Sequence, residues 1–224
     1  MELTMDYCKS SIGKKLMMAV TGLIWTGFVA GHMAGNMLIF VSADAYNSYG
    51  HAITNNRAVY YGIETVLLLS LVTHVVMAFL LSKENWDARP VGYAFQAQGV
   101  KRATLASQTM KYTGAIVLFF VVWHLNAFRF GPVYMTTVNG VEMRDLYKLM
   151  TEAFSSPLYV LGYAVSLGLL GFHLKHGVQA AFQSLGFRHP KYTPWIKCGA
   201  VAYAVIVALG FISQPLYVFF MARN

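Results

Sequence analysis

The chain has 224 residues, of which 57% are hydrophobic and 12% are charged, and its formal net charge is +8. Runs of roughly 18 to 26 mostly apolar residues are long enough to cross a bilayer, so the composition excludes a water-soluble globular protein and indicates an integral membrane protein. The first apolar run follows Lys14 and Lys15. It is about twice as long as the roughly 7–15 apolar residues of a signal peptide, and we expect it to stay in the chain.

Five apolar segments are predicted to cross the membrane as helices, because lipid offers no hydrogen-bond partner to an unpaired backbone. Between the third and fourth segments, Asn139-Gly140 is typical of a hairpin turn, and 143–154 is predicted to form a short amphipathic helix over the outer surface. The sequence therefore predicts an all-α, five-helix membrane bundle in a single domain, 1–224. Its spans are about 16–41, 58–81, 112–128, 157–179 and 199–221.

Lysine and arginine predict the orientation, because short cytoplasmic loops collect basic residues. Twelve lie in the N-terminal tail, the second loop and the fourth connection, against five on the other side, so the N-terminus is predicted to be cytoplasmic and the C-terminus outside. This basic face suits contact with anionic lipid or the docking of a soluble partner, and no nucleic-acid partner is expected. The twelve are Lys9, Lys14, Lys15, Lys83, Arg89, Lys101, Arg102, Lys111, Lys175, Arg188, Lys191 and Lys197; the five are Arg57, Arg129, Arg144, Lys148 and Arg223.

A histidine occurs in each of the first four apolar segments: His32, His74, His124 and His173. At a rise of about 1.5 Å per residue, the first and third lie in the outer half of the membrane and the second and fourth in the inner half. Two level pairs of imidazoles on facing helices are the arrangement needed to bind two haem irons. Cys8 and Cys198 are the two cysteines and the chain has no C-x-x-C-H motif, so any haem is b-type.

The histidines also fit two alternatives to haem binding. A single transmembrane histidine can be hydrogen-bonded inside the bundle, and a proton-coupled transporter also uses buried histidines, although it would add carboxylates, of which Glu64 is the one good candidate. Gly27, Gly31 and Gly35 recur every four residues beside His32. They would admit either a flat macrocycle or a neighbouring helix.

His176 follows His173 by three residues, with Lys175 between them. Two ligands in adjacent turns of one helix cannot bind one iron from both sides. We therefore predict His173 as the ligand and assign His176 and Lys175 to contacts with the haem propionates or with a partner.

At these residues the chain resembles a known family, the dihaem cytochrome b anchor of succinate:quinone oxidoreductases and quinol:fumarate reductases with one large five-helix anchor. The resemblance covers most of the chain. It rests on 18–23 (MAVTGL), 32–36 (HMAGN), 46–51 (YNSYGH), His74, 123–124 (WH) and 172–177 (FHLKHG).

The resemblance implies two b haems, with His32 and His124 on the outer iron and His74 and His173 on the inner one. It also implies a multi-pass protein of the cytoplasmic membrane that joins a flavoprotein subunit and an iron–sulfur subunit on the cytoplasmic side. The resemblance allows the whole complex to form a dimer. Electrons would pass to or from a membrane quinone, with menaquinone implied. The reaction of the dicarboxylate is expected to take place in another subunit, because this chain has no GxGxxG motif for a flavin and no cysteine cluster for an iron–sulfur centre.

The quinone site is predicted near the outer haem, where a carboxylate would exchange protons with the quinone. Asp44 and Glu64 are the candidates. Asp44 could instead be a solvated loop acid or a helix cap, and Glu64 a partner of Arg57 or of a tyrosine hydroxyl. The alternative functions are the dihaem anchor of a formate dehydrogenase or hydrogenase, and a proton-coupled transporter.

Overall fold

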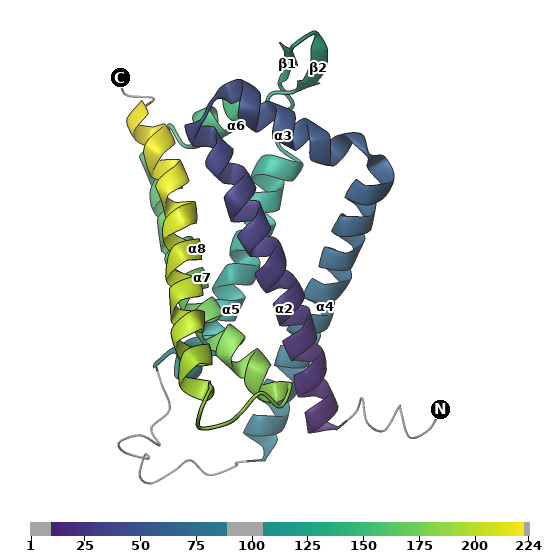
Figure 1. The fold of residues 1–224 in the computed structure, drawn as a ribbon, viewed down its shortest axis with the longest axis vertical. Coiled ribbons are helices and arrows are strands. Elements are labelled where there is room, and N and C mark those ends of the chain that lie inside the picture. The colour runs from purple at the N-terminus through teal and green to yellow at the C-terminus, as the bar shows by residue number, and fades with distance from the viewer. Residues whose placement is uncertain (1–9, 89–104, 222–224) are drawn as a thin grey trace.

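Five long helices dominate the computed structural model, which describes residues 10–88 and 105–221 (Figure 1). Within those ranges, these are the helices long and apolar enough to cross a membrane, which confirms the predicted five-span helical bundle. The basic residues Lys9, Arg89, Lys101, Arg102 and Arg223, and Cys8, lie outside the described residues. The five helices are α2 (Ser11–Asn36), α4 (Arg57–Asp87), α5 (Leu105–His124), α7 (Pro157–Ser184) and α8 (Thr193–Met221).

The helices extend beyond the apolar segments that predicted them, because helical hydrogen bonding continues into the polar residues at their ends. The longest, α4, has 31 residues and so spans about 46 Å, against about 30 Å for the hydrocarbon core of a bilayer. The first span ends in the 3₁₀ turn η1 (Met37–Phe40), and α5 continues into the π-helical turn η3 (Leu125–Arg129).

One end of the bundle carries the short elements α3 (Ala43–Asn55), β1 (Met135–Val138), β2 (Val141–Arg144) and α6 (Leu146–Ala153), and we call it the hairpin end (Figure 1). Helix α3 lies across this end between α2 and α4 and was not predicted from the sequence. Its first turn is capped by Ser42, whose hydroxyl accepts a hydrogen bond from the amide of Ala45 at 3.1 Å.

The two strands pair as an antiparallel hairpin, as the sequence predicted. Asn139 (φ 51°) and Gly140 (φ 78°) both have the positive φ that a tight two-residue hairpin turn requires. The helix predicted at 143–154 is shorter than expected, because Met143 and Arg144 belong to β2. Helix α6 starts only after Asp145, whose carboxylate caps it by accepting from the amide of Lys148 at 2.9 Å.

A buried asparagine joins α3 to the start of α6. Asn47 is 2% exposed. Its amide donates to Asp145 Oδ1 at 2.9 Å, and its carbonyl oxygen accepts from the backbone amide of Tyr147, also at 2.9 Å. The neighbouring Tyr46 hydroxyl donates to Asn36 Oδ1 at 3.2 Å, and burial raises the pKa of Tyr46 above its usual value. These contacts make the hairpin end one continuous cap.

Helix α7 lies at the centre of the packing, since it contacts α2, α5 and α8, while α4 packs against α2. Its most extensive packing is against α8, where a Cβ added at Gly171 would lie 3.1 Å from Ala208 Cβ and 3.6 Å from the carbonyl oxygen of Ala204. Small residues allow this proximity between membrane helices. By contrast, Leu69 and Phe79 of α4 are exposed, as expected of side chains that face lipid.

The Gly171→Val substitution is expected to force α7 and α8 apart and to destabilise the protein by about 1–3 kcal/mol. Thermal unfolding of the detergent-solubilised protein measures the effect. Gly199→Val is the matched control, because a Cβ at Gly199 of α8 meets nothing within 4 Å. Equal unfolding temperatures for the two variants would contradict this account of the α7–α8 contact.

Candidate functional site

The four membrane histidines meet in two pairs inside the bundle. The ring centroids of His32 (α2) and His124 (α5) are 5.9 Å apart, with the rings at 76°. Those of His74 (α4) and His173 (α7) are 6.4 Å apart, with the rings at 64°. The structure thus brings together the same two pairs that equal depth in the membrane predicted. We call His32–His124 the first pair and His74–His173 the second pair.

The separation within each pair fits two imidazoles that share one metal ion. When two imidazoles bind the same ion from opposite sides, each through a bond of about 2 Å, their ring centroids are roughly 6 Å apart. Both observed separations match this value. In residues 10–88 and 105–221, histidine, cysteine and acidic side chains form no group of three or more that could hold a metal ion. Two histidines per ion suit haem, whose macrocycle supplies the remaining ligands.

Three of the four imidazoles are also held through Nδ1. The Nδ1 atom of His74 lies 3.1 Å from the carbonyl oxygen of Met18, and that of His124 lies 3.2 Å from the Tyr163 hydroxyl. The third, on His173, lies 3.4 Å from Thr113 Oγ1. A carbonyl oxygen can only accept, so Nδ1 of His74 carries the hydrogen and its Nε2 lone pair is free. A second-nitrogen hydrogen bond of this kind is the usual support of a metal-binding histidine.

Trp25 gives a further indication that the site holds a group from outside the polypeptide. Its indole N–H is buried and has no hydrogen-bond partner within the described part of the chain. Trp25 lies one turn after Thr21 and two turns before His32, on the face of α2 that carries both residues. A buried donor inside a membrane requires an acceptor, and a haem propionate is one.

Aromatic side chains surround the first pair. Phe28 stacks on His32 with ring centroids 5.4 Å apart and 9° between the rings, and the Phe211 ring lies 5.7 Å from the His32 ring at 51°. Phe120 and Phe128 lie 6.0 and 5.3 Å from His124. These rings give the pair an apolar environment and fix the imidazoles in place.

The three glycines beside His32 have different surroundings. A Cβ at Gly35 would collide with the Tyr49 ring, so this glycine serves packing between α2 and α3. A Cβ at Gly27 or Gly31 would meet nothing within 4 Å, which leaves open space along α2. His176 is half-buried one turn beyond His173 on α7, and Lys175 is exposed.

Glu64 lies towards the hairpin end of α4 and forms an ion pair that the sequence did not reveal. Arg129 of η3 donates from Nε to Glu64 Oε1 at 2.6 Å, and the Tyr60 hydroxyl donates to the same oxygen at 2.5 Å. Of the two predicted partners, the tyrosine hydroxyl is present, and the arginine is Arg129 instead of Arg57. Asp44 is exposed in the first turn of α3, whose cap is Ser42.

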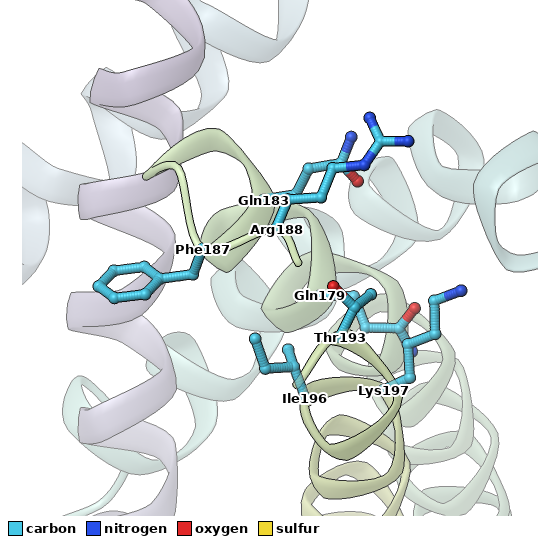
Figure 2. A pocket seen from close by; sticks show the side chains of 7 residues that line it. All are labelled: Gln179, Gln183, Phe187, Arg188, Thr193, Ile196 and Lys197. Carbon is cyan, nitrogen blue, oxygen red and sulfur yellow. The ribbon is translucent and has the colours of Figure 1, made fainter. Parts of the chain in front are cut away.

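The opposite end of the bundle has a cavity of about 190 Å³ between the end of α7 and the start of α8 (Figure 2). Arg188 lies beside Gln183, and Phe187 points away from the polar side chains (Figure 2). Basic groups and amides in one recess suit an acidic surface or headgroup. The lining consists of Gln179, Gln183, Phe187, Arg188, Thr193, Ile196 and Lys197.

A five-span bundle with paired internal histidines is the architecture of a membrane cytochrome b. Residues 87–210 match the family described as succinate dehydrogenase/fumarate reductase transmembrane subunit. The match covers more than half of the chain and includes His124 and His173. The chain therefore belongs to this family of haem-binding membrane anchors, and neither the formate dehydrogenase or hydrogenase alternative nor the transporter alternative is favoured. Comparison with curated proteins and with solved structures gave no match.

Proposed function

We propose that this chain binds two b haems and carries electrons between an iron–sulfur subunit on the cytoplasmic side and a quinone in the membrane. The observation that carries the proposal is the presence of two imidazole pairs with ring centroids 5.9 and 6.4 Å apart. When bound, each haem would supply a one-electron carrier, which amino-acid side chains lack. His32 and His124 would hold the outer haem, and His74 and His173 the inner one.

The protein's own residues would then orient the ligands and exclude water. The Nδ1 contacts of His74 and His173 would leave Nε2 of these two imidazoles for iron, and the Tyr163 hydroxyl would hold the ring of His124. The aromatic side chains around the first pair keep its surroundings apolar. Thr21 contacts the second pair and His32 belongs to the first, and these two residues are eleven positions apart on α2, so the two pairs lie about 16 Å apart along the helix. With a haem at each pair, this spacing would divide the transfer of an electron across the bilayer into shorter steps.

The charge distribution supports a cytoplasmic N-terminus and an external hairpin end. Of the described basic residues, those assigned to the cytoplasmic side belong to the parts of the chain at the end opposite the hairpin. Lys14 pairs there with Glu84, and Lys83 with Asp87 at 2.5 Å. The remaining positive charge and the cavity beside Arg188 would face the flavoprotein and iron–sulfur subunits of the complex.

The quinone, with menaquinone proposed from the resemblance, would react near the outer haem at the hairpin end. Glu64 is the first candidate for the proton-exchanging group, because its carboxylate accepts a hydrogen bond from the Tyr60 hydroxyl. Its ion pair with Arg129 holds the carboxylate in place. Asp44 is the second candidate. This site would complete the role of the chain as the quinone-reactive subunit of the complex.

The purified complex is expected to contain two b haems per copy of this chain, both low-spin, because protein nitrogens fill both axial positions of each iron. Pyridine hemochrome quantitation gives the ratio and electron paramagnetic resonance the spin state. A ratio near one, or a strong high-spin signal from the intact complex, would remove one histidine pair from the assignment.

His173→Ala is expected to lose the inner haem, because its ring is the one that faces His74. His176→Ala serves as the matched control on the same helix and is expected to keep both haems. The haem content and the reduced-minus-oxidised spectrum of the two variants distinguish them. The reverse result would assign the ligand role to His176.

Glu64→Gln is expected to lower quinone-linked turnover by about 100-fold or more, because an amide cannot exchange the proton. Both haems and succinate oxidation with an artificial acceptor are expected to remain. Asp44→Asn provides the comparison, and a loss confined to that variant would assign the role to Asp44. Normal quinone activity in both variants would show that another group handles the proton.

A further inference from the structure

A threonine–glycine pair occurs at the same place in the two helices that carry the first histidine pair. In α2, Thr21-Gly22 precedes His32, and in α5, Thr113-Gly114 precedes His124. In both helices the threonine lies eleven positions, about three turns, before the histidine. Three turns of helix bring a residue back to nearly the same face. Each threonine therefore lies on the same helix face as the first-pair histidine that follows it, but about three turns further from the hairpin end. This is the level of the second histidine pair.

Both threonines contact an imidazole of the second pair through the same atoms. Thr21 Oγ1 lies 3.3 Å from Nδ1 of His74, and Thr113 Oγ1 lies 3.4 Å from Nδ1 of His173. Both threonine side chains are buried. Helix α2 thus supports the imidazole of α4, and α5 supports the imidazole of α7, in two equivalent arrangements.

The direction of these hydrogen bonds follows from the other partners of the threonines. The Thr21 hydroxyl donates to the carbonyl oxygen of Met17 at 2.7 Å, and the Thr113 hydroxyl donates to that of Met110 at 3.1 Å. A hydroxyl has one hydrogen, so each oxygen can offer only a lone pair to the imidazole. The histidine Nδ1 atoms must therefore be the donors, which leaves Nε2 on each ring unprotonated and free to bind a metal.

The glycines allow the same imidazoles to lie directly against the helix backbone. A Cβ at Gly22 would lie 3.2 Å from Cε1 of His74, and a Cβ at Gly114 would lie 3.2 Å from Cε1 of His173. At this distance the ring would have to move by a few tenths of an ångström. Threonine thus fixes the tautomer of each ring, and glycine fixes its distance from the helix.

We propose that Thr21-Gly22 and Thr113-Gly114 are positioning residues for the two axial histidines of the inner haem, and that they set its reduction potential. The inference rests on the dihaem function proposed above and extends it to residues that do not touch iron. A hydrogen bond donated by Nδ1 makes Nε2 a stronger base, which stabilises oxidised iron and lowers the potential. Each helix that supplies an outer ligand also holds an inner one.

The two threonines are not expected to contribute equally to the positioning of the imidazoles. Nδ1 of His74 has a second acceptor, the carbonyl oxygen of Met18 at 3.1 Å, whereas the contact of Nδ1 of His173 is with Thr113. The loss of Thr21 can be compensated by Met18, so the loss of Thr113 should have the larger effect.

The test uses the intact complex and measures the potentials of both haems by optical redox titration. Thr113→Val, which keeps the shape and removes the acceptor, is expected to raise the potential of the inner haem and to leave that of the outer haem unchanged. Thr21→Val should give a smaller rise, and Thr113→Ser a potential near that of the parent. Thr109→Val and Thr26→Val are the matched controls, since their hydroxyls donate to the carbonyl oxygens of Leu105 and Gly22.

A second measurement does not depend on the hydroxyl. Gly114→Ala is expected to tilt the His173 ring and so to shift the largest g value of the inner haem in the electron paramagnetic resonance spectrum, while Gly199→Ala leaves it unchanged. Loss of the inner haem in Thr113→Val with retention in Thr113→Ser also supports the proposal. An inner-haem potential and spectrum unaffected by Thr113→Val, or identical changes in the valine and serine variants, would overturn it.

Haem content of the parent complex separates this proposal from the function on which it rests. If the parent has two haems and Thr113→Val has no effect, only the positioning role fails. If the parent lacks the inner haem, the dihaem assignment fails, and the positioning role fails with it.

Discussion

The requirement that every buried polar atom find a partner in a medium without water governs this structure. Helices meet it for the backbone. An imidazole needs a partner at each ring nitrogen, and for His74, His124 and His173 the chain provides Nδ1 partners from Thr21, Thr113, Tyr163 and the carbonyl of Met18. The two rings of each pair have centroids 5.9 and 6.4 Å apart, a separation that matches one shared metal ion. The same requirement explains the unpartnered N–H of Trp25, which lies where a bound group would provide an acceptor.

The parts of this arrangement that depend on local sequence could be predicted. Apolar length gave the five spans, helical rise gave the pairing of His32 with His124 and of His74 with His173, and Asn139-Gly140 gave the hairpin turn. Helix α3 was missed because 43–55 mixes apolar with polar residues and sits outside the membrane, where neither length nor hydropathy marks a helix.

Apart from the two histidine pairs, contacts between side chains distant in the sequence were beyond sequence reasoning. Glu64 and Arg129 are 65 positions apart, and nothing in the chain favours Arg129 over Arg57 as the partner. The threonines gave no signal individually, because a hydroxyl in a membrane helix ordinarily bonds to its own backbone. Their contribution is visible only as a spacing, threonine–glycine followed after nine residues by histidine, that occurs once in α2 and once in α5. That spacing could have been found in the sequence by comparing the first and third spans.

The hydrogen bonds of Asn47 have a consequence for the order in which the protein is made. Its partner Asp145 is 98 positions later, and the amide of Tyr147 is 100 positions later. A chain that inserts from its N-terminus must therefore complete three spans before α3 can acquire the contacts that bury this asparagine. Until then the Asn47 side chain depends on water, which is available because α3 lies at the end of the bundle and not within the lipid. The cap thus closes over a bundle that is already more than half assembled.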